Sequence, residues 1–112
     1  MRASDRIDGL LDDLEQTLHS ADQLVARGRE AFDADFTVRL AFEALSNRVG
    51  EATKRLVQLD PDLFTETEWT FASRHRDKVV HHYNSIDVEV LWSTVATHFP
   101  RLRELAHSKR PR

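Results

Sequence analysis

The sequence contains no cysteine, and it has only three glycines and three prolines in 112 residues. Without cysteine the chain can form neither a disulfide nor a thiolate metal site, which is typical of proteins in a reducing cytoplasm. The scarcity of glycine and proline favours long helices over many strands and turns. The sequence also lacks an apolar run long enough to span a bilayer, and its start does not resemble a signal peptide. We therefore expect a cytoplasmic protein with no membrane partner.

A strong excess of one charge is also missing. Lysine and arginine number 16 against 19 aspartates and glutamates, which gives a net charge of −3 with neutral histidines. Proteins that bind nucleic acid indiscriminately usually carry a large positive excess, so this class is disfavoured while a local basic site is not. A charged fraction of 31% and a hydrophobic fraction of 40% are typical of globular proteins. We predict one domain over residues 1–112.

Apolar residues recur at helical spacing in four successive segments. The first covers residues 7–25 and should stop at Gly28. The second begins near residue 33 or 35 and should end before Pro61, since proline disfavours a helical residue in front of it. Gly50 lies in the middle of this segment, where glycine costs about 1 kcal/mol relative to alanine. We interpret Gly50 as the point where a neighbouring helix approaches closely.

The third and fourth segments have their own boundary signals. The pattern Thr65-x-x-Glu68 predicts a capping box at the start of the third helix, and Asn84 with Ser85 predicts its end. The fourth helix should begin near Ile86 and contain Pro100, which should kink it or divide it in two. Short loops make successive helices antiparallel. We predict an all-α, up-and-down bundle of four to five helices.

The residues able to perform chemistry are concentrated between Arg74 and Tyr83. Arg76 and Tyr83 share one helix face, and Asp77 can reach His81 one turn later. Arg76 and His81, however, lie about 140° apart on an ideal helix. Either the helix unwinds before His81, or a second copy of the chain completes the site across a two-fold interface. We favour the second explanation, which predicts a homodimer.

Arginine and histidine together are sufficient for RNA cleavage without a metal or another cofactor. The guanidinium of arginine is a rigid fork of donors that matches a phosphate. Histidine has an ordinary pKa of about 6.5, so it can remove a proton from a ribose 2′-hydroxyl or donate one to a leaving oxygen. The 2′-hydroxyl then attacks the adjacent phosphate, a reaction that DNA cannot undergo.

The pattern Arg76-x4-His81-x-Tyr83 resembles the R-x4-H-x-Y motif of the HepT-like HEPN proteins. The polar residue after the arginine, Asp77, also fits this motif. The surrounding sequence resembles the family too, on the second helix, before the motif and near the C-terminus. These matching positions are Val49-Gly50-Glu51-Ala52, Pro61, Trp69, Ile86-Asp87, Leu91-Trp92, Pro100, Leu102 and Leu105.

The resemblance implies a homodimeric toxin with ribonuclease activity and a cleft at the dimer interface, acting on cellular RNA such as tRNA. Arg76 and His81 would be catalytic, and Asp77 would orient His81. Tyr83 would accept AMP from a minimal nucleotidyltransferase (MNT) that acts as antitoxin. We expect RNA contacts from three further residues near the motif: Arg74, Lys78 and His82.

Each of these assignments has an alternative. His75, His81 and His82 could instead bind a metal, although their directions diverge. Tyr83 could equally be an interface or core aromatic residue, and Glu51 could face the cleft or be an ordinary salt-bridged residue. The basic tail formed by Lys109, Arg110 and Arg112 is expected to be a frayed, solvated terminus.

The whole protein also has two alternative interpretations. It could be a non-catalytic HEPN subunit that binds a nucleotide or docks a nucleotidyltransferase without cleaving RNA. It could also be a purely structural helical dimer, but this leaves the Arg76–Tyr83 motif unexplained. An RNA cleavage assay separates the first alternative from the toxin.

Overall fold

The computed structural model describes residues 2–81 and 86–110, and this part of the chain consists of helices without a strand. The elements are α1 (Ala3–Val25), α2 (Arg29–Ala34), α3 (Phe36–Leu59), α4 (Thr67–His81), α5 (Val88–Ser93), the π-helical segment η2 (Thr94–His98) and α6 (Phe99–Ser108). The predicted all-α class is therefore confirmed.

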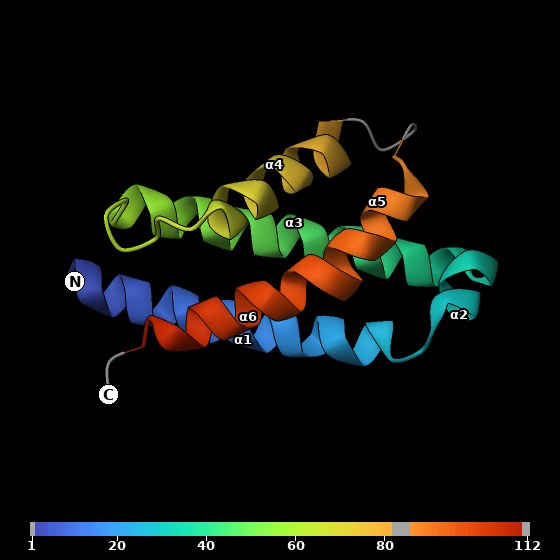
Figure 1. The fold of residues 1–112 in the computed structure, drawn as a ribbon, viewed down its shortest axis with the longest axis horizontal. Coiled ribbons are helices and arrows are strands. Elements are labelled where there is room, and N and C mark those ends of the chain that lie inside the picture. The colour runs from blue at the N-terminus through green and yellow to red at the C-terminus, as the bar shows by residue number, and fades with distance from the viewer. Residues whose placement is uncertain (1, 82–85, 111–112) are drawn as a thin grey trace.

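Figure 1 shows the helices running up and down along one long axis, with the N- and C-termini near the same end. The helix α3 packs against both α1 and α4, and α6 returns along α1. In this view α4 crosses α3 and then rises away from it toward its C-terminal end. This arrangement confirms the up-and-down bundle and places the C-terminal end of α4 at the edge of the molecule.

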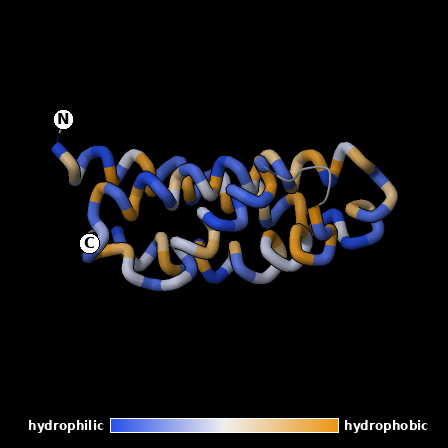
Figure 2. Tube along the Cα trace, turned by 90° about the horizontal axis from the view of Figure 1, so that it is seen from above, coloured by the Kyte–Doolittle hydropathy of each residue, from blue (hydrophilic) through white to orange (hydrophobic). Residues whose placement is uncertain are grey.

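The core is formed by the apolar stripes that the sequence predicts. Hydrophobic and hydrophilic residues alternate along every helix (Figure 2), which gives each helix one buried side. Phe32, Phe42 and Trp92 form one aromatic cluster, with ring centroids 4.7 to 5.5 Å apart. Phe64 and Trp69 form a second pair at 4.8 Å. No helix in residues 2–81 or 86–110 is long and apolar enough to cross a membrane.

Several helix boundaries follow from local chemistry. The Asp35 carboxylate accepts hydrogen bonds from the backbone N–H and the hydroxyl of Thr37, which caps α3. The end of α3 at Leu59, before Asp60 and Pro61, is as predicted. The short helix α2 was not predicted, because six residues give too little periodicity to recognise.

The predicted capping box at Thr65 and Glu68 is wrong. The helix α4 begins at Thr67, one residue later than the box requires. Glu68 instead pairs with Arg101 at 3.3 Å, and the neighbouring Glu66 accepts a hydrogen bond from the indole nitrogen of Trp69 at 2.8 Å. A partner from another helix therefore competes successfully for the carboxylate that the local pattern assigned to the cap.

The predicted break at Pro100 is confirmed. Proline has no N–H to donate and clashes with the preceding turn, and the five residues of η2 lie directly before α6, in which Pro100 is at the first turn. The backbone N–H of Phe99 donates to the carbonyl of Thr94, the wider spacing of a π-helix. The fourth helix is thus divided into α5 and α6.

The basic tail is not frayed where the structure describes it. Lys109 pairs with Glu66 at 2.9 Å, and Arg110 pairs with Glu15 at 2.7 Å and with Asp12 at 2.5 Å. These contacts fasten the end of α6 to α1 and to the start of α4. The expectation of a solvated terminus is therefore wrong for these two residues, and Arg112 lies outside the described residues.

Candidate functional site

Gly50 sets the geometry of the candidate site, because α4 crosses α3 directly over it. A Cβ atom on residue 50 would lie 2.0 Å from Cβ of Arg76 and 2.9 Å from the backbone oxygen of Ala72. No side chain fits in that space, so only glycine permits this crossing. The interpretation of Gly50 as a point of close approach is confirmed, and the residue pressed against it is the motif arginine.

The guanidinium of Arg76 extends along α3 and meets three acceptors. Its Nε donates to Oδ1 of Asn47 at 2.9 Å, and its Nη2 lies 3.6 Å from Oε2 of Glu51. Its Nη1 lies 3.3 Å from Oδ1 of Asp77. The side chain is 22% exposed. A phosphate can therefore reach Arg76, but it must displace a carboxylate to form hydrogen bonds with both terminal nitrogens of the guanidinium.

Asn47 was missed at the sequence level, whereas Glu51 was considered as a residue that could face a cleft. The two are one helical turn apart on α3, on either side of Gly50. The position of Gly50 was the available signal, since residues one turn apart beside a helix crossing face the same partner helix. The identity of that partner residue could not be read from α3 alone.

His81 is exposed at the end of α4, on a different side of this helix from Arg76. The helix is continuous from Thr67 to His81, so it does not unwind before the histidine. Among the described residues, no hydrogen bond or ion pair joins His81 to Arg76 or to Asp77. One copy of the chain thus keeps the two motif residues apart.

Asp77 was expected to contact and orient His81, and the structure places its carboxylate elsewhere. It pairs with the neighbouring Arg76 rather than with the imidazole one turn later. The guanidinium carries a permanent charge and a planar fork of donors that matches the geometry of a carboxylate. His82 and Tyr83, the expected RNA contact and AMP acceptor, lie outside the described residues.

His75 is buried and has a structural environment. Its Nε2 shares a 3.1 Å hydrogen bond with the Ser46 hydroxyl, and its ring lies edge-on to Phe99 at 6.5 Å. Burial, with smaller contributions from Lys78 and His98, lowers the pKa of His75 to about 4. The imidazole is therefore neutral at pH 7 and points into the core. Sequence reasoning could not find Ser46, which is 29 residues away.

The metal alternative has no support in the described part of the chain. The buried imidazole of His75 is turned away from the exposed His81. Residues 2–81 and 86–110 contain no group of three histidine, aspartate or glutamate side chains placed to hold a metal ion. Of the three histidines considered, His82 lies outside these residues.

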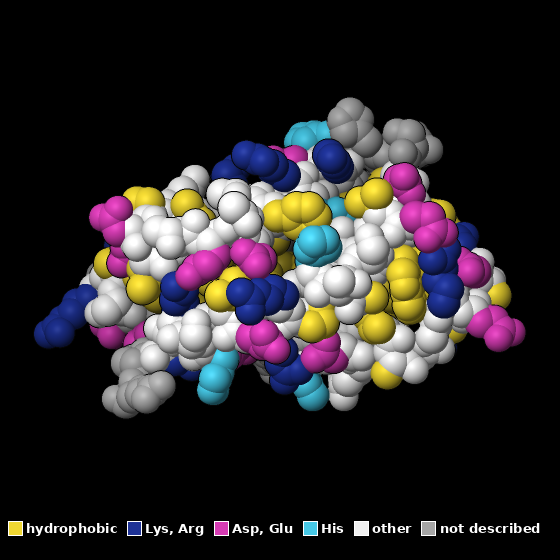
Figure 3. Space-filling model, viewed as in Figure 1, with side chains coloured by type: hydrophobic (Ala, Val, Ile, Leu, Met, Phe, Trp, Pro, Cys, Tyr) yellow, Lys and Arg dark blue, Asp and Glu magenta, His cyan; other side chains and the backbone are white. Residues whose placement is uncertain are grey.

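The outer surface of α4 is basic. Arg74 and Lys78 are exposed there, and Figure 3 shows lysine and arginine side chains with a histidine along the upper edge of the molecule, where α4 lies in Figure 1. Arg74 also lines a shallow hollow with Phe71 and His98. The predicted RNA contacts at Arg74 and Lys78 are therefore accessible, and they stay predictions.

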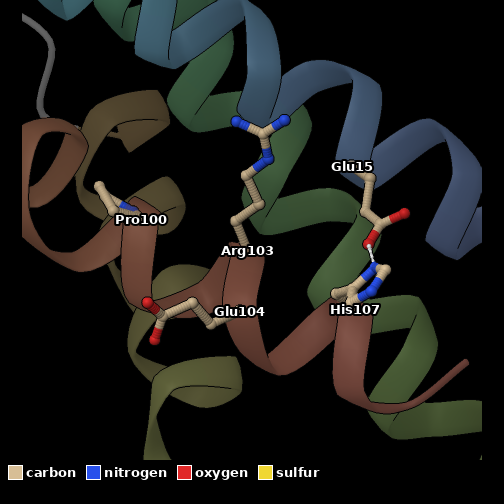
Figure 4. A pocket seen from close by; sticks show the side chains of 5 residues that line it. All are labelled: Glu15, Pro100, Arg103, Glu104 and His107. Atoms are coloured by element: carbon tan, nitrogen blue, oxygen red, sulfur yellow. Dashed lines mark ion pairs between the residues drawn. The ribbon is translucent and has the colours of Figure 1, made fainter.

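A second hollow lies between α1 and α6, away from the motif (Figure 4). It is lined by Glu15, Pro100, Arg103, Glu104 and His107. His107 Nδ1 lies 3.5 Å from Oε1 of Glu15, and Arg103 pairs with Asp22. These contacts join the two helices, and no predicted site residue within residues 2–81 and 86–110 lines this hollow.

Comparison with known proteins agrees with the motif and its setting. The family model described as ribonuclease HepT-like matches residues 14–108, which is most of the chain. The chain belongs to the HepT-like ribonuclease family. The resemblance of the Arg76–Tyr83 segment to the HepT-like motif is thereby confirmed as a family relationship. No solved structure matches the chain.

Three relatives of the chain carry ribonuclease names. A protein of Thermococcus cleftensis named a probable ribonuclease HepT is 35% identical over 74 residues, covering 66% of this chain and 67% of that protein. A protein of Caldanaerobacter subterraneus subsp. tengcongensis named as a candidate RNase is 26% identical over 95 residues, covering 81% and 85%. A protein of Methanocaldococcus jannaschii with the same kind of name is 35% identical over 52 residues, covering 46% and 43%.

Proposed function

We propose that this chain is a metal-independent endoribonuclease of a HepT/MNT toxin–antitoxin system, which cleaves cellular RNA such as tRNA at a cleft between two copies. The observation that carries the proposal is the placement of Arg76. The close crossing of α4 over Gly50 fixes the backbone of Arg76, and α3 holds its guanidinium at a partly exposed position. The ribonuclease family of the chain supports the same activity.

Arg76 would bind the scissile phosphate and stabilise the negative charge that develops on its oxygens. A guanidinium held in place before the reaction is effective because it needs no reorganisation as charge appears. Asn47 fixes Nε, which leaves both terminal nitrogens directed at groups that a phosphate could replace. The incoming phosphodiester, which is a monoanion, would exchange with the carboxylates of Glu51 and Asp77.

His81 would act as the general acid and base. As base it would take the proton of a ribose 2′-hydroxyl, whose oxygen attacks the adjacent phosphorus. The bond from phosphorus to the 5′-oxygen breaks, and a protonated imidazole supplies the proton to that oxygen. The products are a 2′,3′-cyclic phosphate and a free 5′-hydroxyl. In each shared site the His81 of one copy would act first as base and then, once protonated, as acid.

The separation of Arg76 and His81 within one copy supports a site shared between two. The helix α4 is continuous and its two motif residues face different sides. A two-fold axis brings the same patch of both copies together, so Arg76 of one copy could face His81 of the other. The homodimer is therefore part of the proposal.

Control by an MNT antitoxin completes the proposed system. The antitoxin would transfer AMP from a nucleoside triphosphate to the hydroxyl of Tyr83, forming a phosphodiester bond and releasing pyrophosphate. Tyr83 follows His81 by two residues. A phosphate added there would repel RNA and compete for the guanidinium of Arg76.

A non-catalytic subunit that binds a nucleotide or docks a nucleotidyltransferase is the second candidate. The engagement of Arg76 with Asn47, Glu51 and Asp77 in one copy favours it, because a guanidinium with that many partners can be a structural group. It predicts binding without cleavage at any pH. The two candidates share a partner, so only an RNA cleavage assay separates them.

The deciding experiment incubates purified protein, free of its partner, with total tRNA in the presence of EDTA. A His81→Ala variant is run beside it, since this exposed residue should be replaceable without unfolding the chain. Mass spectrometry first establishes that Tyr83 carries no AMP. Cleavage by the unsubstituted protein alone is the expected result. Equal cleavage by both proteins would remove His81 from the mechanism, and no cleavage by either would favour the binding subunit.

A further inference from the structure

Four residues of α4 form a stripe on its exposed face that leads away from His81. Phe71, Arg74, Lys78 and His81 lie within about 80° of one another around the helix axis, and each is exposed. We refer to these four residues as the outer stripe. It spans ten residues, or about 15 Å along the helix, which is long enough for a few nucleotides of a single strand.

The end of the outer stripe farthest from His81 carries an aromatic pair. The rings of Phe71 and His98 lie 4.3 Å apart with an angle of 30° between their planes. Phe71 comes from α4, whereas His98 is the last residue of η2. Phe71 is 39% exposed, and His98 is also exposed. An accessible pair of rings is the surface on which a nucleobase can stack.

In the part of the chain that the structure describes, the cations of the outer stripe have no carboxylate partner. Arg74 and Lys78 form no ion pair in residues 2–81 and 86–110, and the remaining positions hold no aspartate or glutamate. Among the described residues, Arg29, Arg101 and Arg110 each pair with a carboxylate, whereas Arg27 and Arg48 do not, and neither of these two unpaired arginines belongs to the outer stripe. The charge of Arg74 and Lys78 is therefore available to an external anion.

A shallow hollow joins the aromatic pair to the first cation. It is lined by Thr67, Glu68, Thr70, Phe71, Arg74 and His98. The single carboxylate among them, on Glu68, is paired with Arg101 at 3.3 Å, which reduces its repulsion of a phosphate. The two threonines add hydroxyl groups that can bond to a sugar or a base edge. Stacking surface, positive charge and hydrogen-bonding groups thus lie together.

We infer that the outer stripe is a binding track for single-stranded RNA, and that Phe71 and His98 hold a base of the strand whose scissile phosphate lies near His81. This inference rests on the proposed ribonuclease function and adds a substrate-binding subsite to it. Arg74 and Lys78 contact the phosphates between that base and the cleavage point. Stacking tolerates every base, so the track should bind unpaired RNA with little preference for sequence. Loops or ends of a folded RNA fit it best.

The test measures binding of fluorescein-labelled oligoadenylate by fluorescence anisotropy. All proteins carry His81→Ala, so that the RNA stays intact. Phe71→Ala is expected to weaken binding by about 5- to 150-fold, the range for loss of a stacked base, whereas Phe71→Trp keeps the affinity. Phe36→Ala is the matched control, since Phe36 is 61% exposed at the start of α3 and should have no effect.

A second set of oligonucleotides, each lacking one base, identifies the cause of any loss. If Phe71 stacks on a base, one abasic oligonucleotide should bind the Phe71→Ala protein and its parent equally well. Equal binding of intact RNA by both proteins would overturn the inference. So would a loss that is the same for all oligonucleotides and that accompanies a change of oligomeric state in light scattering, because the aromatic pair would then belong to a contact between copies.

The subsite and the proposed function fail in different ways. RNA cleavage by the protein with no effect of Phe71→Ala on binding would leave the ribonuclease intact and remove the subsite. Base-dependent binding through Phe71, without cleavage by the protein that retains His81, would keep the subsite and favour the non-catalytic RNA-binding or nucleotide-binding subunit.

Discussion

The two motif residues proposed as catalytic have opposite environments. Arg76 is 22% exposed, lies over Gly50 and has three partners on α3 and α4. His81 is exposed at the end of α4, and no hydrogen bond or ion pair within the described residues holds it. Two motif residues that are five positions apart in the sequence thus differ: contacts hold the guanidinium of Arg76, whereas the imidazole of His81 is exposed. The comparison suggests that one copy of the chain supplies a prepared phosphate site, while the position of the proton-transfer group depends on a second copy.

The largest expected effect comes from mixing two inactive variants. Arg76→Ala and His81→Ala should each lower RNA cleavage by about 10²- to 10⁴-fold. In a mixed dimer one shared site receives both substitutions and the other receives neither. With random exchange half of the dimers are mixed, so activity should recover to about a quarter of that of the unsubstituted protein. Cleavage rates are measured after denaturation and joint refolding of the two variants.

A site contained within one copy predicts a different result. Every site in the mixture would then carry one substitution, and activity would stay at the level of the separate variants. Joint refolding of Arg76→Ala with the double variant Arg76→Ala/His81→Ala is the control, since it leaves no arginine at any site. Recovery in that control would exclude a role for Arg76 in the shared site.

Gly50→Ala should move Arg76 and the helix α4 away from α3. The new Cβ would lie 2.0 Å from Cβ of Arg76, so α4 must move away from α3. Overpacking of a close contact typically costs about 1 to 3 kcal/mol, and a backbone shift raises this; we expect a loss of about 3 kcal/mol or more in the free energy of unfolding. Urea denaturation followed by circular dichroism measures it.

Gly9→Ala provides the matched control for that experiment. Gly9 also lies within a helix, but an added Cβ there meets nothing within 4 Å. Alanine should stabilise α1 at this position by about 0.5 to 1 kcal/mol. Equal effects of the two substitutions would contradict the assignment of Gly50 as a steric requirement of the crossing.

The sequence predicted features that depend on local chemistry and missed those that depend on distant partners. The crossing at Gly50, the end of α3 before Pro61 and the division at Pro100 follow from properties of glycine and proline that hold in any context. The capping box at Thr65 failed because Glu68 found Arg101, 33 residues away. The motif itself was recognisable from the sequence, but Asn47 as the partner of Arg76 was not. The sequence of α4 alone does not show which face of α3 this helix packs against.

The buried residue His75 should make the folding stability of the chain depend on pH. Its pKa is about 4 in the folded chain and about 6.5 in the unfolded chain. Between these two pH values the imidazole is therefore mostly protonated in the unfolded chain and mostly neutral in the folded chain. Stability should therefore fall as the pH decreases from 6.5 toward 4, by up to about 3 kcal/mol at 1.36 kcal/mol per pKa unit.

The His75→Gln variant isolates this contribution, because glutamine stays neutral and can still bond to Ser46. The difference in unfolding free energy between the two proteins should change with pH between 6.5 and 4, and stay constant above pH 7.5. Carboxylates with lowered pKa, such as Glu66 beside Lys109, lose their contribution at lower pH and in both proteins alike. A difference that is independent of pH would show that the imidazole is already accessible to solvent.

The smallest expected effect concerns the hydrogen bond from Arg76 to Asn47. Asn47→Ala removes the acceptor of Nε, so the guanidinium should lose its orientation, and the maximal cleavage rate should fall by about tenfold while stability changes by less than about 0.5 kcal/mol. Asn47→Asp retains an acceptor but adds a negative charge beside the phosphate position. It should preserve the maximal rate and raise KM, and Lys54→Ala, at an exposed position of α3, should change neither. If Asn47→Ala changed KM alone, the fixed position of Arg76 would matter for binding RNA and not for the chemical step. The contrast between a fixed arginine and an exposed histidine would then not explain catalysis.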